Sequence, residues 1–168
     1  MTLATDTVAD ESAPTAPWLE WLGLAVRLTL GVVAGWAGIA KMMDLPTSVR
    51  AVRAYQLLPE AIVPAVGYAL PMVEIILGLL LITGLLTRYV AAVQGLIMAG
   101  FVFGISMAWA RGLNIDCGCF GGGGELDESQ EAEYLIPLLR DVGLVIGAAY
   151  LVWFPRTRFS LDEALDLN

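Results

Sequence analysis

The chain has 168 residues, of which 58% are hydrophobic and only 15% charged, a composition too apolar for a soluble domain and typical of a polytopic membrane protein. Its net charge of −8 comes without a cluster of basic residues, which argues against nucleic-acid binding. The sequence contains no histidine, which excludes His-ligated haem, zinc and copper and every acid–base mechanism that needs an imidazole.

A membrane domain is predicted at residues 18–155, with a short tail before it and another after it. Residues 1–17 are polar, acidic and interrupted by prolines, so we expect them to be disordered. They lack the basic stretch and short apolar core of a secretory signal. Residues 156–168 follow Pro155 and form a short acidic C-terminal tail, with room for one or two helical turns.

Four long apolar segments make up the membrane domain, and each suffices to cross a bilayer, which needs about 20 apolar residues. We predict spans at 18–43, 62–86, 89–110 and 135–154. Small residues four apart, such as Gly31 with Gly35 and Gly143 with Gly147, allow neighbouring helices to approach closely. The predicted fold is an all-α integral membrane protein, a bundle of four transmembrane helices with both termini at the same end.

Two charged residues fall inside the first two spans. Arg27 shares a stripe with Gly31, and Glu74 lies near the middle of the second span. A charge within the hydrocarbon region is costly unless it faces protein or a polar cavity. If the two spans are antiparallel, Arg27 and Glu74 lie at similar depths, and we expect them to form an ion pair within the bundle.

The connection at residues 44–61 is predicted to contain a short amphipathic helix. Its apolar side chains lie opposite its arginines (Val49, Val52 and Tyr55 against Arg50 and Arg53). We interpret it as a connector lying on the membrane surface, in preference to a binding element.

The loop between the third and fourth spans, GLNIDCGCFGGGG at 112–124, contains both cysteines of the chain, Cys117 and Cys119. Cα atoms two residues apart are separated by at most about 7 Å, so a disulfide is possible, with Gly118 supplying backbone freedom. Such a ring would be strained and easily reduced, and it would stabilise little because it closes a minimal loop. We therefore interpret the pair as a dithiol that exchanges with another dithiol or passes electrons to a small oxidant.

Charges near this loop act in both directions. Lys41, Arg111 and Arg140 are expected at the same membrane face, where positive charge favours the reactive thiolate. Asp116 and the acidic run at 125–133 oppose it.

The orientation cannot be read from the arginines and lysines, because the two faces are nearly balanced. A cysteine pair in a solvent-facing loop suits an oxidising compartment. We therefore expect a multi-pass protein of the plasma (cytoplasmic) membrane, with cytoplasmic termini and an extracytoplasmic Cys loop.

Two other interpretations of the cysteines stay open. Two thiolates could hold a soft ion such as Cu(I), whereas zinc would need two further ligands. The cysteines could also be incidental in a structural subunit of a larger membrane assembly. The glycine run at 121–124 is not followed by the Gly-Lys-Ser/Thr of a phosphate loop, so we assign it no nucleotide.

Over about residues 18–155 the chain resembles the MauE (methylamine utilisation) branch of the DoxX-like membrane proteins. The residues that carry the resemblance are Arg27, Gly35, Gly38, Lys41, Tyr55-x-Leu57-Leu58-Pro59, Glu74 after Pro71, Arg111-Gly112, Cys117-Gly118-Cys119-Phe120-Gly121 and Arg140-Asp141. The segment CGCFG between the third and fourth spans is the most specific of them.

The resemblance implies a redox-linked accessory protein whose dithiol exchanges with an extracytoplasmic thioredoxin-fold partner during disulfide formation in methylamine dehydrogenase. Cys117 and Cys119 would be the catalytic pair, and the supporting residues would be Gly118, Phe120, Gly121, Lys41, Arg140 and Asp141. A quinone or another membrane subunit could stand downstream, and no metal is assigned. Similar quinone-linked enzymes carry a second cysteine pair, which is absent here. The alternative is a non-catalytic subunit or assembly factor of a membrane oxidoreductase complex.

Overall fold

The computed structural model describes residues 17–126, 132–155 and 157–164. The predicted disordered N-terminal tail, apart from Pro17, lies outside the described residues, and so do Asp127, Glu128 and Glu131 of the acidic run.

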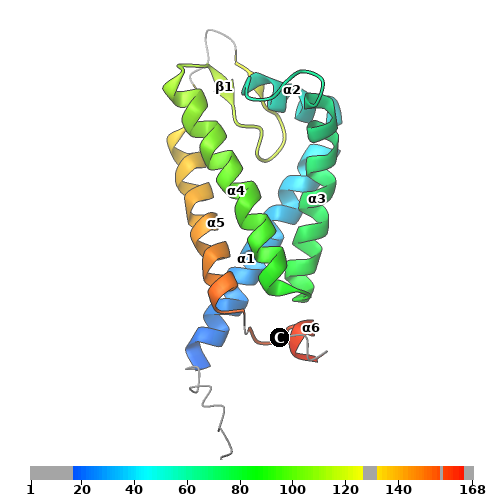
Figure 1. The fold of residues 1–168 in the computed structure, drawn as a ribbon, viewed down its shortest axis with the longest axis vertical. Coiled ribbons are helices and arrows are strands. Elements are labelled where there is room, and N and C mark those ends of the chain that lie inside the picture. The colour runs from blue at the N-terminus through cyan, green and yellow to red at the C-terminus, as the bar shows by residue number, and fades with distance from the viewer. Residues whose placement is uncertain (1–16, 127–131, 156, 165–168) are drawn as a thin grey trace, which may run out of the picture.

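Four long helices lie side by side and form the body of the protein (Figure 1). They are α1 (Pro17–Met42), α3 (Val63–Thr83), α4 (Thr87–Ala110) and α5 (Leu135–Trp153). Each is long and apolar enough to cross a membrane, and their bounds agree closely with the predicted spans. The predicted fold class, an all-α membrane bundle of four helices, is confirmed.

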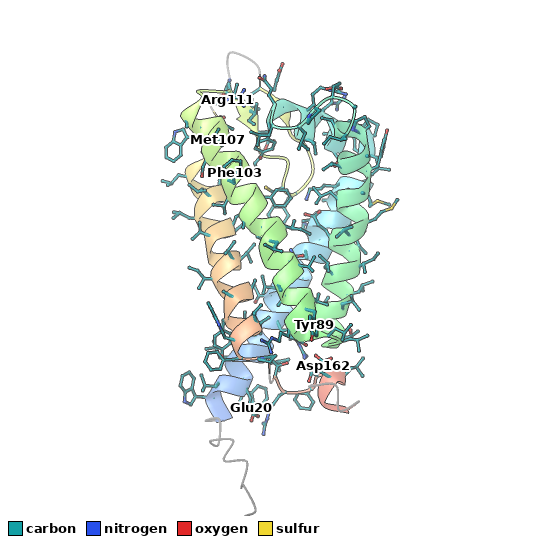
Figure 2. The ribbon with its side chains drawn as sticks, viewed as in Figure 1. Glu20, Tyr89, Phe103, Met107, Arg111 and Asp162 are labelled. Atoms are coloured by element: carbon teal, nitrogen blue, oxygen red, sulfur yellow. The ribbon has the colours of Figure 1, made fainter. Side chains whose placement is uncertain are left out.

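The apolar residues of these helices point outward as much as inward. Trp36, Leu96 and Trp153 are 66, 74 and 75% exposed, and Figure 2 shows side chains projecting all along the outer faces. Exposed apolar area costs about 25 cal/mol per Å² in water, so this outer surface requires a lipid bilayer around it. The buried core is small and joins all four helices: Leu30, Leu77, Leu81, Val90, Ala91, Ala148 and Leu151.

Short elements close the two ends of the bundle. At one end lie the helix α2 (Leu45–Ala54) and an antiparallel pair of two-residue strands, β1 (Ile115–Asp116) and β2 (Gly124–Glu125). The segment between the strands turns back toward the helices (Figure 1). At the other end, the short helix α6 (Leu161–Ala164) lies beyond the ends of α3 and α4 (Figure 1).

The contact between α1 and α3 is made by small residues. A side chain added at Gly38 would lie 2.7 Å from the Pro71 carbonyl oxygen, and one at Gly78 would lie 2.7 Å from the Gly35 nitrogen. The two backbones therefore touch, which is the packing that small residues allow in membrane helices. This contact sets the antiparallel register, in which Gly38 lies beside Pro71 and Gly35 lies beside Gly78.

The predicted ion pair between Arg27 and Glu74 is wrong, because the same register places Arg27 near Gly84, at the far end of α3. A side chain added at Gly84 would clash with Arg27 Nη1. Arg27 instead donates to Thr157 Oγ1 at 2.8 Å and to the Phe159 carbonyl at 3.1 Å. The C-terminal segment thus bonds its two terminal nitrogens, whereas its buried Nε has no hydrogen-bond partner among the described residues.

That C-terminal segment is docked on the bundle. Thr157, Ser160 and Asp162 are buried, and the Asp162 carboxylate accepts hydrogen bonds from the backbone nitrogens of Leu86 at 2.6 Å and Thr87 at 2.8 Å. These are orphan N–H groups at the start of α4, so Asp162 acts as a helix cap supplied from a distance in sequence. Figure 2 places Asp162 at the end of the bundle away from the Cys loop.

The amphipathic helix predicted at 44–61 is α2, which starts where Asp44 accepts a hydrogen bond from the Thr47 nitrogen at 3.1 Å. Its inward face packs on protein: Ser48 Oγ donates to the Gly67 carbonyl of α3 at 3.0 Å. Ala51 on the same face contacts the Cys loop. The helix is therefore a cover over the Cys loop as well as a connector.

Candidate functional site

The two cysteines lie in the tight turn between β1 and β2, and Gly118 between them permits it. Gly118 has a φ of +66°, a left-handed conformation that favours glycine, and its nitrogen donates to Asp116 Oδ1 at 3.2 Å. A side chain at this position would lie 2.7 Å from the Ala51 Cβ of α2. The turn can therefore pass under α2 only with glycine at position 118.

The two thiols have different surroundings. Cys117 is half-buried, whereas Cys119 is only 7% exposed and faces the bundle. Cys119 Sγ lies 4.0 Å from Asp141 Oδ2 of α5 and 3.9 Å from the Cys117 carbonyl oxygen. Cys117 is thus partly accessible at the protein surface, whereas Cys119 is held against a buried carboxylate.

The same contacts separate the acidities of the two thiols. A hydrogen bond from the Cys119 side chain lowers the pKa of Cys117 to about 7, and the Arg140 guanidinium acts in the same direction, although burial and Asp116 oppose it. That hydrogen bond, together with burial and the negative charge of Asp141, raises the pKa of Cys119. Cys117 is therefore the thiol that ionises first, and the thiolate is the nucleophile in disulfide exchange.

Tyr55, directly after α2, holds the loop in place. Its hydroxyl donates to the Cys117 carbonyl at 3.1 Å, and burial raises the pKa of Tyr55, so the hydroxyl keeps its proton. Arg111, expected near the thiols, donates instead to the Tyr55 carbonyl at 3.2 Å and to Gln56 Oε1 at 3.2 Å. Arg111 thus fixes the segment that carries Tyr55.

Four charged side chains lie beneath Cys119 as two ion pairs. Lys41 Nζ lies 2.8 and 2.7 Å from the two carboxylate oxygens of Glu74, and Arg140 Nη2 lies 2.8 Å from Asp141 Oδ1. Lys41, Glu74 and Asp141 are nearly inaccessible to solvent, at 5, 1 and 1% exposure. Buried charges are tolerated when each has a partner of opposite sign and good geometry, as here.

Phe120 and Gly121 complete the loop. The Arg140 guanidinium stacks 4.5 Å from the centre of the Phe120 ring, a cation–π contact that keeps Arg140 beside the thiols. A side chain added at Gly121 would lie 3.4 Å from the Ala40 carbonyl oxygen, so this glycine lies against the end of α1. Lys41 makes a similar contact, 5.4 Å from the centre of the Phe101 ring.

A small cavity of about 10 Å³ opens below Cys119, roughly the space that one water molecule needs. Its lining comes from α1, α3, α4, α5 and the Cys loop: Val33, Ala34, Ala37, Glu74, Met98, Phe101, Cys119, Phe120, Arg140, Asp141 and Leu144. Glu74, Arg140, Asp141 and the buried thiol of Cys119 therefore border one shared space.

The structure thus brings almost all of the predicted site residues together. The cysteines, Gly118, Phe120, Gly121, Lys41, Arg140, Asp141 and Glu74 form one cluster, whereas Arg27 belongs to the other end of the bundle. The sequence reasoning missed the roles of Tyr55 and Ala51. Their spacing of four residues on one helical face, with a small residue toward the glycine loop, is the signal that could have found them.

Within the described ranges, no three His, Cys, Asp or Glu side chains are grouped as metal ligands would be.

Comparison with known proteins identifies one family. The family model described as methylamine utilisation protein MauE matches residues 19–154. No curated protein and no solved structure matches the chain. The match covers all four long helices and the Cys loop, and the chain therefore belongs to the MauE family of membrane proteins linked to methylamine utilisation.

Proposed function

We propose that the chain is a membrane thiol–disulfide exchange protein whose Cys117–Cys119 pair alternates between dithiol and disulfide. The observation that carries this proposal is the asymmetry of the pair: a half-exposed Cys117 of lowered pKa stands above a buried Cys119 of raised pKa. An accessible thiol that ionises readily, with a second thiol beside it, suits disulfide exchange.

In this proposal Cys117 is the thiol that meets the partner. When the pair is reduced, the Cys117 thiolate attacks the partner's disulfide and forms a mixed disulfide, releasing one partner sulfur as a thiolate that takes up a proton. Cys119 then attacks Cys117 and releases the second partner sulfur. Two electrons pass to the partner and the Cys117–Cys119 disulfide forms; the reverse sequence oxidises a partner dithiol.

The partner is a thioredoxin-fold protein outside the cytoplasm, and the process served is the formation of disulfides in methylamine dehydrogenase. Membership of the MauE family, described as methylamine utilisation proteins, supports the link to this process. The proposed orientation in the plasma membrane has cytoplasmic termini and an extracytoplasmic Cys loop, because a reducing cytosol would keep the pair reduced.

A quinone ring cannot be enclosed in the cavity beside the thiols. The cavity below Cys119 has room for about one water molecule, which is far less than a quinone ring occupies. In disulfide formation the electrons pass from the partner dithiol to the Cys117–Cys119 pair, and we assign their onward transfer to another membrane subunit.

The test is a mixed-disulfide trap in cells that produce the full-length protein. Cys119→Ser leaves Cys117 unable to resolve its adduct, so a covalent complex with a thioredoxin-fold protein should accumulate and be identifiable by mass spectrometry. Cys117→Ser is the matched control, and it should trap far less because Cys119 is buried.

Two results would contradict the proposal. One is equal trapping by the two variants or by neither. The other is a pair of thiols that a membrane-impermeant alkylating reagent reaches only after lysis, which would reverse the orientation. Normal assembly of a membrane complex without either cysteine would favour the structural-subunit interpretation.

A further inference from the structure

Asp141 presents one free carboxylate oxygen to the buried thiol. Its Oδ1 accepts from Arg140 Nε and Nη2, both at 2.8 Å, whereas its Oδ2 lies 4.0 Å from Cys119 Sγ. Glu74, the other buried carboxylate of the cluster, has both oxygens bonded to Lys41. Asp141 is therefore the carboxylate of this cluster that is placed to exchange a proton with Cys119.

The chemistry of the pair requires such a group. Cys119 must lose its proton before it can attack Cys117, yet it is only 7% exposed and its surroundings disfavour the thiolate. A proton transfer between buried groups needs an acceptor within direct reach or one water away. Asp141 Oδ2 meets this condition from α5.

Several titratable groups surround the contact between Cys119 and Asp141. They are Lys41 of α1, Glu74 of α3, Arg140 of α5, Tyr55 after α2, and Cys117 and Asp116 of the loop. The helix α4 contributes Met98 and Phe101, which do not titrate. Lys41 and Arg140 each have a carboxylate partner, so the acceptor oxygen remains Oδ2 of Asp141.

We propose that Asp141 is a catalytic acid–base residue that takes the proton from the Cys119 thiol when the disulfide forms and returns it when the disulfide opens. In the forward step the S–H bond of Cys119 breaks, its proton moves to Asp141 Oδ2, and the thiolate forms a bond to Cys117 Sγ. The Cys117–partner bond breaks, and the partner sulfur leaves with the electron pair. This inference rests on the proposed exchange function.

The test uses the reduced full-length protein in membranes and oxidised glutathione as the probe. Cys117 attacks glutathione disulfide in a first step, and Cys119 displaces glutathione in a second; acid quenching and mass spectrometry measure both. Asp141→Asn should leave the first step unchanged and lengthen the life of the glutathione adduct at least about tenfold, since positioned acid–base groups contribute roughly 10²–10⁴-fold.

The pH profile separates a chemical role from a structural one. In Asp141→Asn the second step should accelerate with rising pH, because hydroxide must then remove the proton, whereas the unaltered protein should show a flatter profile. Asp141→Glu should restore much of the rate, and Glu125→Gln, an exposed carboxylate of the same loop, is the control that should change neither step.

The outcomes keep the two proposals apart. If glutathione disulfide gives neither an adduct at Cys117 nor the Cys117–Cys119 disulfide in the unaltered protein, the exchange function is wrong. If the adduct forms and Asp141→Asn resolves it as fast as the unaltered protein, only the role of Asp141 is wrong.

Infrared difference spectra of the unaltered protein provide a test that needs no variant. A protonated carboxyl band should appear when the dithiol is oxidised, and its absence would overturn the role of Asp141.

Discussion

The acidity of Cys117 depends first on its neighbour, and removing that neighbour gives a quantitative test. The hydrogen bond from Cys119 is the main reason why the pKa of Cys117 falls from an ordinary 9.0 to about 7. In Cys119→Ala this bond is lost, so the pKa of Cys117 should rise toward its ordinary value. The burial of Cys117 acts in the same upward direction.

The size of the effect follows from two opposing terms. A thiol with a pKa of about 7 is about half ionised at pH 7, whereas one at 9.0 is about 1% ionised, which is a loss of roughly 50-fold in thiolate. A more basic thiolate is also a better nucleophile, and a Brønsted slope of about 0.45 returns a factor of roughly 8 for a rise of about two units in the pKa of the thiol. The net expectation at pH 7 is an alkylation rate about sixfold lower.

The assay is the rate of alkylation of Cys117 by iodoacetamide between about pH 5 and pH 10, a range that spans both the lowered and the ordinary pKa of the thiol. The rate should increase with pH, because only the thiolate reacts, with a midpoint near 7 in the reduced unaltered protein and a higher midpoint in Cys119→Ala. Asp116→Asn is the control of opposite sign, since Asp116 raises the pKa of Cys117. A midpoint near 9 in the unaltered protein, or no change in Cys119→Ala, would refute the reasoning.

Three further predictions concern stability, each measured by unfolding in detergent or bicelles. Glu74→Gln and Lys41→Met should each lower the free energy of unfolding by about 3–5 kcal/mol, because each leaves a buried charge without its partner. Replacing both residues by apolar side chains should recover most of that loss. Losses that add up in the double variant would argue against a coupled pair. Asp162→Ala removes a helix cap and should lower the free energy of unfolding by about 0.5–2 kcal/mol. Asp162→Asn should lower it less, because the amide oxygen can still accept a hydrogen bond. Equal losses in the two variants would contradict the capping role. Gly118→Ala should lower the free energy of unfolding by about 1–3 kcal/mol or displace α2, because the added methyl group meets Ala51 and the backbone has a positive φ. Displacement of α2 should make proteolysis of the Cys loop faster. An unchanged digestion pattern would contradict the packing of the loop against α2.

Hydropathy and length were enough to predict the fold. Four segments of about 20 apolar residues have few alternatives to membrane-spanning helices, because in lipid every backbone polar group must be paired within the segment. The only two cysteines of the sequence singled out the loop with Cys117 and Cys119, and their spacing showed that a disulfide between them is possible. These features depend on residues near one another in sequence.

What the sequence could not decide was which distant groups meet. The glycine contact between α1 and α3 sets a register that a hydropathy pattern does not encode, and this register pairs Glu74 with Lys41 and sends Arg27 to the C-terminal segment. The difference between Cys117 and Cys119 likewise appears only when the loop folds under α2 and brings one thiol against Asp141. Composition and spacing therefore determined the membrane bundle and its dithiol. The tertiary structure decided which thiol is shielded and which charges surround it, because burial and the choice of ionic partner depend on helix packing.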